Sequence, residues 1–86
     1  MKTIYKYTLD VATEQNIETF EDFRIRHVDV QNGNICCWGE IDTSAPKETK
    51  TIYVVGTGQE IPYGTYWVGT VLRDGCVWHV YVDSEY

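Results

Sequence analysis

The chain has 86 residues, of which 43% are hydrophobic and 14% aromatic, and its formal net charge is −6. This length allows one domain with a single modest core, too small for a deep cleft between domains. The negative charge disfavours long nucleic acids and anionic membranes and favours a basic or amphipathic protein partner. No stretch has the apolar core of a signal peptide or the roughly 20 apolar residues that span a bilayer, so we expect a cytosolic protein.

The N-terminal third predicts strands. Residues Thr3 to Leu9 alternate in polarity, which places Tyr5, Tyr7 and Leu9 on an inward face. Residues 10–23 allow two interpretations, a short helix capped by Thr13 or an acidic loop with a short strand around Ile17. We favour the loop with a strand, because turn signals at short intervals are typical of an all-β chain.

A tight hairpin is expected from Arg24 to Asp42, since Asn32-Gly33 joins two runs rich in β-branched and aromatic residues. A two-residue turn fixes the register, in which partner numbers sum to 65. The predicted pairs are Gln31–Asn34, Asp29–Cys36, His27–Trp38 and Ile25–Glu40. One face then carries the core candidates Val28, Val30, Ile35, Cys37 and Ile41. The other face carries His27, Asp29, Gln31, Asn34, Trp38 and Glu40.

The segment after this hairpin predicts a polar connection over 43–48, a strand over 49–55 and a long glycine-rich connection over 56–64. Alternation is blurred in Tyr53-Val54-Val55, which indicates burial on both faces of the strand. The length of the 56–64 connection makes it a candidate binding loop. Its Gly-Thr-Gly lacks the spacing and the following helix of a dinucleotide fingerprint, so a turn that needs positive φ explains it better.

A second hairpin is expected over 66–82, with its turn at Asp74-Gly75 and partner numbers that sum to 149. Val71 then faces Trp78, and Thr70 faces His79. The predicted core face is Trp67, Val71, Trp78, Val80 and Val82. The opposite face is Tyr66, Val68, Thr70, Leu72, Val77, His79 and Tyr81. Together these elements predict a single all-β domain over 1–86, a small antiparallel β-sandwich or partly open barrel of about six strands with two tight hairpins.

The residue types and their spacing do not favour a catalytic site or a metal site. His27, Asp29 and Cys36 share one hairpin face, but a flat sheet offers no evident oxyanion donors, and acidic neighbours should raise a thiol pKa. The three cysteines and two histidines lack zinc-ligand spacing, and adjacent strand residues point to opposite faces. We therefore expect no enzyme, no metal and no cofactor.

Two sets of residues are candidates for binding. The partner-binding set joins the displayed hairpin face to the densest acidic run: His27, Asp29, Gln31, Trp38, Glu40, Glu14, Glu18, Glu21 and Asp22. The alternative set would hold a small anionic nucleotide with cations, loop amides and a stacking ring: Arg26, Lys50, Gly56, Thr57, Gly58, Trp38 and Tyr66.

The segments MKTIYKY, VDVQNGNICCWGEID, KTIYVVGTGQEIP, YWVGT and WHVYV resemble, in the same order, a family of small bacteriophage-encoded proteins with no established activity. This resemblance implies expression in a bacterial host cytoplasm. Many small acidic phage proteins without enzymatic motifs inhibit bacterial defence, so the first hypothesis is a stoichiometric antagonist of a host defence protein, acting as an acidic nucleic-acid mimic. The alternatives are a sponge for a nucleotide immune signal, which would require an oligomer, and a virion or morphogenesis accessory protein.

Overall fold

Seven antiparallel strands and no helix make up residues 1–83, the part of the chain that this computed structural model describes. Their bounds are β1 (Lys2–Leu9), β2 (Gln15–Phe20), β3 (Arg24–Gln31), β4 (Asn34–Asp42), β5 (Lys47–Gly56), β6 (Thr65–Arg73) and β7 (Cys76–Asp83). The all-β prediction is confirmed. The segment 10–23 contains a strand, as the favoured interpretation held, and the helical alternative is wrong.

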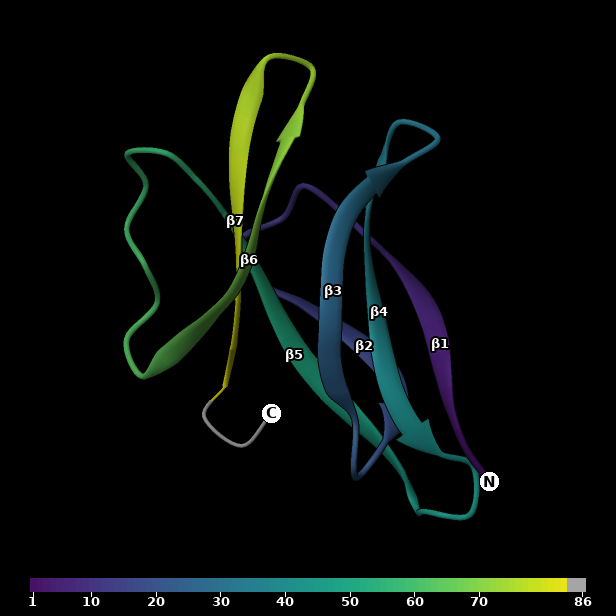
Figure 1. Cartoon of the computed structure of the whole chain (residues 1–86). Helices are drawn as coiled ribbons and strands as arrows, with labels where there is room; N and C mark the ends of the chain where they lie inside the picture. Colours follow the sequence, from purple (N-terminus) through teal and green to yellow (C-terminus); the bar gives the residue numbers. More distant parts are fainter. Residues whose placement is uncertain (84–86) are drawn as a thin grey trace.

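The strands form two sheets that pack as a sandwich (Figure 1). One is three-stranded in the order β1-β4-β3, and the other is four-stranded in the order β2-β5-β7-β6. The two sheets approach each other closely where Gly69 of β6 meets Val28 of β3, because a Cβ atom at position 69 would lie 2.8 Å from the Val28 side chain. On the opposite side, the Tyr7 hydroxyl of β1 lies 2.6 Å from Thr19 Oγ1 of β2. The strands at the sheet edges are therefore stacked as β3 on β6 and β1 on β2.

The first hairpin has the predicted turn, with φ of 52° at Asn32 and 78° at Gly33. Pairing follows the predicted register for Gln31–Asn34, Asp29–Cys36 and His27–Trp38. The predicted Ile25–Glu40 pair is wrong, because a bulge between Ile25 and His27 shifts the register and places Arg24 opposite Glu40.

The second hairpin turns at Asp74 and Gly75, both with positive φ, and Thr70 faces His79 as predicted. A bulge between Trp67 and Gly69 then exchanges the two faces of β6. Trp67 pairs with Tyr81 on the outer face and is 59% exposed, so its predicted place in the core is wrong. Tyr66 moves to the inner side at the sheet edge, where it is also 59% exposed.

The core lies between the two sheets and is built from aliphatic and aromatic side chains of nearly every strand. Its buried members are Leu9, Phe23, Ile35, Cys37, Ile41, Ile52, Val54, Val71, Val80 and Val82. Val28, Val30 and Trp78 pack against it from half-buried positions, as the alternation predicted. Both Val54 and Val55 are 1% exposed, which confirms burial on the two faces of β5.

Candidate functional site

The displayed face of the first hairpin is the outer face of the three-stranded sheet. His27, Asp29 and Gln31 are exposed there, and the half-buried Trp38 lies among them on the central strand β4. The rings of His27 and Trp38 are 5.5 Å apart, and His27 Nε2 lies 3.4 Å from Asp29 Oδ2. The structure thus brings together the hairpin part of the predicted partner-binding set.

Charged groups on this face form hydrogen bonds and ion pairs with neighbouring side chains. Glu40 accepts a hydrogen bond from Arg26 Nε at 3.1 Å and lies 3.6 Å from Lys2 Nζ. The hydrogen bond and charge of Arg26, with a smaller contribution from Lys2, lower the pKa of Glu40. Lys6 Nζ donates to Gln31 Oε1 at 2.8 Å. Because these polar groups already interact with one another, a partner would have to compete with existing bonds to use them.

Cys36 is on the same face but is only 2% exposed, covered by the flanking strands of the sheet. Its thiol donates weakly to the carbonyl oxygen of Asn34 at 3.6 Å and lies 4.0 Å from Thr8 Oγ1. The thiol therefore packs into the sheet instead of presenting a nucleophile to solvent.

The acidic run belongs to β2 and its flanks, on the other sheet. Glu18 pairs with Thr49 and projects from the outer face of the four-stranded sheet. Glu14 lies near the same outer face. The pKa of Tyr53 is raised by burial, by Asp83 and, to a smaller extent, by the charge of Glu14. Asp22 has a structural contact, since its Oδ1 accepts a hydrogen bond from Asp42 N at 3.2 Å. The structure therefore divides the predicted partner-binding set between the two sheets.

The alternative nucleotide-binding set does not come together. Arg26 and Trp38 lie on the outer face of the three-stranded sheet, whereas Gly56–Gly58 begin a loop beside the four-stranded sheet (Figure 1). Lys50 is 7% exposed on the inner face of β5, with its Nζ 2.6 Å from Glu48 Oε2. Tyr66, the second aromatic residue of this set, lies at the start of β6.

The Gly56–Gly58 segment is held by hydrogen bonds with nearby residues of the chain. Gly56 N donates to Gln59 Oε1 at 2.7 Å, and Gln59 N donates to Gly56 O at 3.0 Å. Thr57 Oγ1 lies 2.9 Å from His79 Nε2. At least one of the amides proposed to cradle a phosphate is thus already hydrogen-bonded, which agrees with a turn more than with an anion site.

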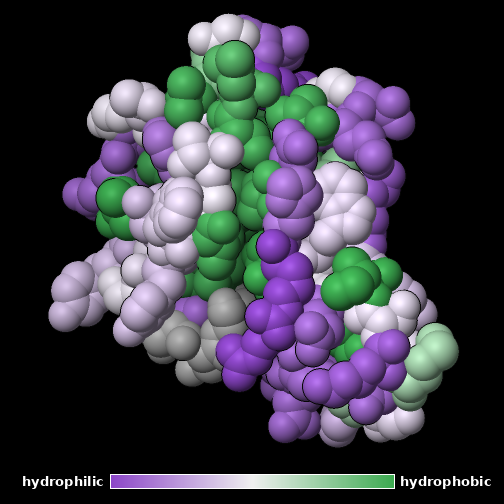
Figure 2. Space-filling model, in the orientation of Figure 1, coloured by the Kyte–Doolittle hydropathy of each residue, from purple (hydrophilic) through white to green (hydrophobic). Residues whose placement is uncertain are grey.

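The outer face of the β6–β7 hairpin carries an apolar surface, on which alternation placed Leu72 and Val77 but not Trp67. Trp67 is 59%, Leu72 67% and Val77 39% exposed, and we call these three residues the β6–β7 face. Leu72 and Val77 are direct cross-strand partners. In Figure 2, a column of hydrophobic residues runs along the edge where the hairpin meets β3, and hydrophilic residues cover the β3 side of this column. On this outer face, the Thr70–His79 pair lies between Trp67 and the Leu72–Val77 pair. Exposed apolar side chains grouped on one face of a small protein mark interaction sites.

A hydrogen-bond chain fixes the indole of this face. Trp67 Nε1 donates to Thr70 Oγ1 at 2.9 Å, and Thr70 Oγ1 lies 3.1 Å from His79 Nδ1. His79 is held on its other side by Thr57. The exposed ring is therefore preorganised, which reduces the entropy lost on binding. The signal that could have placed Trp67 on this surface is Gly69, because a glycine within a strand pattern indicates a bulge that exchanges the faces.

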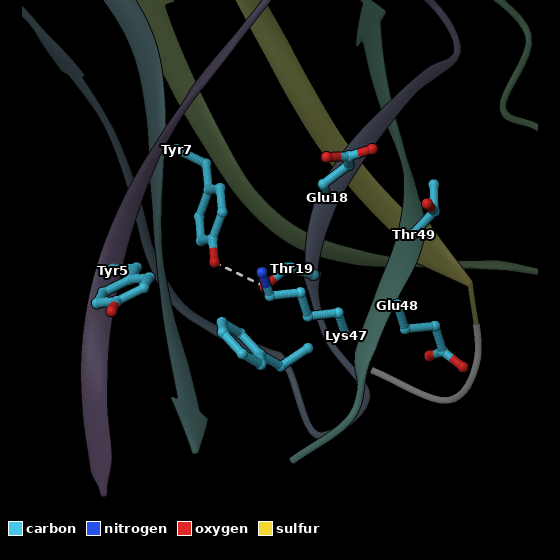
Figure 3. A pocket seen from close by; sticks show the side chains of 8 residues that line it. Tyr5, Tyr7, Glu18, Thr19, Lys47, Glu48 and Thr49 are labelled. Atoms are coloured by element: carbon cyan, nitrogen blue, oxygen red, sulfur yellow. Dashed lines mark hydrogen bonds between the residues drawn. The ribbon is translucent and has the colours of Figure 1, made fainter. Parts of the chain in front are cut away.

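A groove of about 460 Å³ opens between β1, β2 and the start of β5 (Figure 3). Figure 3 shows the Tyr7 hydroxyl pointing toward Thr19, with the Lys47 side chain beside them. Burial raises the pKa of Tyr7, and the hydrogen bond with Thr19 partly offsets this effect. The remaining lining residues are Tyr5, Glu18, Phe20, Glu48 and Thr49. The lining mixes both charges with aromatic rings and so defines no single ligand chemistry.

Within residues 1–83, no group of three or more His, Cys, Asp or Glu side chains is placed to hold a metal ion. The same residues include no helix that is long and apolar enough to cross a membrane. Neither a curated protein nor a solved structure matches the chain. Residues 1–86 match the family described as Domain of unknown function (DUF7352), and the chain therefore belongs to that family.

Proposed function

We propose that this protein is a non-enzymatic binding protein that acts stoichiometrically and docks its partner on the β6–β7 face. The observation that carries the proposal is the exposure of Trp67, Leu72 and Val77 on one sheet surface. Tryptophan is among the residues that contribute most to protein interfaces. Covering these side chains would remove apolar area from water at about 25 cal/mol per Å².

The charge of the chain favours a basic partner. The net charge is −6, and Glu14 and Glu18 lie toward the β2 edge of the same four-stranded sheet. A partner with an apolar patch beside basic side chains would complement both ends of this surface. Long-range attraction would then speed association and weaken as salt is added.

A bacterial defence protein is the partner we propose. The chain resembles small phage-encoded proteins, and a protein of this kind would work in the cytoplasm of the infected cell. The separation of Arg26 and Trp38 from the Gly56–Gly58 loop supports a protein partner over a sequestered nucleotide. The internally paired charges of the first hairpin support docking on the other sheet.

Phage plating tests this function. The chain is expressed in bacteria that each carry one defence system, and the plating efficiency of a phage restricted by that system is measured. We expect the wild type to restore plating against one of the systems and the double variant Trp67→Ala, Leu72→Ala to lose that effect while keeping its melting temperature. Val11→Ala is the matched control, because Val11 is 44% exposed in the connection between β1 and β2, outside the β6–β7 face, and it should behave as wild type.

Two results would contradict the proposal. If the wild type restores plating against none of the systems tested, defence antagonism fails. If the folded double variant restores plating as well as the wild type does, the β6–β7 face is not the docking surface.

A further inference from the structure

Strand β1 is an open edge of the three-stranded sheet. It pairs with β4 over eight consecutive residues, Lys2–Leu9, without a register shift. The edges β3 and β6 differ from it, because each contains a bulge and the two strands are stacked on each other at Val28 and Gly69. The remaining edge, β2, is shorter and bears the acidic run. β1 is thus the longest regular edge among the described strands.

The hydrogen-bond pattern shows which backbone groups of β1 point away from β4. Thr43 N donates to Met1 O at 2.9 Å, so the two residues form a hydrogen-bonded pair. Because such pairs alternate along an antiparallel ladder, Thr3, Tyr5 and Tyr7 bond to β4. The N–H and C=O groups of the even-numbered residues therefore point outward from the sheet edge: Lys2, Ile4, Lys6 and Thr8.

Natural edge strands usually carry protection against pairing, such as bulges, prolines, inward-pointing charges or lysines along the edge. β1 has no bulge, proline or inward-pointing charge, but it has two lysines, Lys2 and Lys6. Its lysines project to the outer face, where Lys2 interacts with Glu40 and Lys6 with Gln31. In the middle of the strand, Ile4 is 48% and Tyr5 43% exposed.

We propose that β1 pairs antiparallel with β1 of a second copy, giving a homodimer in which three strands from each copy form one six-stranded sheet. This inference is independent of the proposed docking on the β6–β7 face, which belongs to the other sheet.

Charge selects the register of this pairing. A two-fold axis at Tyr5 makes partner numbers sum to 10, so Lys2 faces the partner's Thr8 and Ile4 faces the partner's Lys6. An axis one residue earlier, at Ile4, would place Lys2 opposite the partner's Lys6. An axis one residue later would place Lys6 opposite the partner's Lys6. Like charges directly opposite each other destabilise a sheet, so the register centred on Tyr5 is favoured.

The same axis brings the β2 strands of the two copies toward each other, since Tyr7 and Thr19 hold β2 over β1. The acidic side chains of both copies, including Glu18, would then repel one another. Salt screens this repulsion, whereas the backbone hydrogen bonds are little affected. The affinity of the dimer should therefore increase as salt is added. The affinity for the proposed basic partner should instead decrease.

Light scattering after size-exclusion chromatography, at several protein and salt concentrations, tests the pairing with two variants of one residue. Lys6→Pro removes an N–H that points away from β4, so the ladder within the monomer survives. Lys6→Ala removes the same side chain but keeps this N–H. We expect wild type and Lys6→Ala to have twice the mass of one chain and Lys6→Pro to have the mass of one chain. A monomeric wild type, or a dimeric Lys6→Pro, would overturn the proposal.

Cross-linking tests the register and does not depend on the folding of the proline variant. Tyr5 faces the partner's Tyr5 as a non-hydrogen-bonded pair, in which side chains lie closest. Tyr5→Cys, in a Cys76→Ser background that removes the exposed thiol, should form a disulfide-linked dimer under mild oxidation. Lys6→Cys in the same background faces Ile4 and should stay uncross-linked. Equal cross-linking of both variants, or none of Tyr5→Cys, would overturn this arrangement.

Discussion

Replacing Gly39 with alanine should destabilise the fold through one defined contact. Gly39 is in the central strand β4, and a Cβ atom there would lie 2.1 Å from Cε1 of the Phe23 ring. Ordinary contact begins at about 3.4 Å, so the ring would have to move by about 1.3 Å (3.4 − 2.1). Phe23 is 1% exposed and packs edge-to-face on Tyr7 at 5.4 Å, which leaves little room for such a movement.

The expected cost of Gly39→Ala is about 2–3 kcal/mol, as for other overpacked cores. A chain of 86 residues has a free energy of unfolding of about 4–13 kcal/mol, so the loss is large. Urea unfolding followed by tryptophan fluorescence measures it. In a Phe23→Ala background, which itself costs about 3–5 kcal/mol, the added Gly39→Ala should cost less than about 1 kcal/mol because the clash is gone. An equal cost of Gly39→Ala in both backgrounds, or a negligible cost in the wild type, would refute this reasoning.

Three further predictions concern single side chains. Burial, with a smaller contribution from the neighbouring thiol, raises the pKa of Cys37 to about 12, so a thiol reagent at neutral pH should modify Cys76 rapidly, and Cys76→Ser should abolish the fast phase. Because Arg26 lowers the pKa of Glu40, the charged carboxylate stabilises the fold at pH values above the usual pKa of a glutamate. The urea midpoint of the wild type should therefore exceed that of Glu40→Gln near neutral pH, and the gap should close as the pH falls below that usual pKa and the carboxylate takes up a proton. Trp78→Ala should cost about 3 kcal/mol in urea unfolding, since the half-buried ring packs against the core, and a cost below about 1 kcal/mol would contradict this packing.

Turn chemistry made much of the fold predictable from the sequence. Asn32-Gly33 and Asp74-Gly75 adopt positive φ in tight turns, and each turn fixes the register of the pairs next to it. Alternation then identified the core-facing residues of β4 and β7, including Ile35, but not the burial of Cys36 on the other face of β4. These features depend on neighbours in the sequence, so a local pattern is sufficient to reveal them.

The bulges were not predicted, and they changed the candidate sites. Counting along β6 from Asp74 assumes one partner for each residue, and the extra residue before Gly69 breaks that count. Trp67 therefore moved from the predicted core to the surface that we propose for docking. The bulge in β3 likewise broke the pairing of Ile25 with Glu40. Each bulge lies near the point where β3 and β6 stack on each other across the two sheets. This contact joins residues far apart in the sequence, so the alternation within one segment does not reveal it.

The position of the acidic run also depended on long-range contacts. The strand around Ile17 was predicted, but the sequence did not indicate which sheet it would join. Pairing of β2 with β5 places Glu18 on the four-stranded sheet, away from Trp38. The partner-binding set was consequently divided between the two sheets, and only its acidic part shares a sheet with the β6–β7 face.

Amide chemical-shift mapping is the most direct measurement of the docking surface. The isotope-labelled protein would be titrated with the defence protein whose activity it relieves in the plating assay. We predict that the shifts concentrate at Trp67, Thr70, Leu72, Val77 and His79. Shifts concentrated instead on the first hairpin, around His27 and Trp38, would contradict the account.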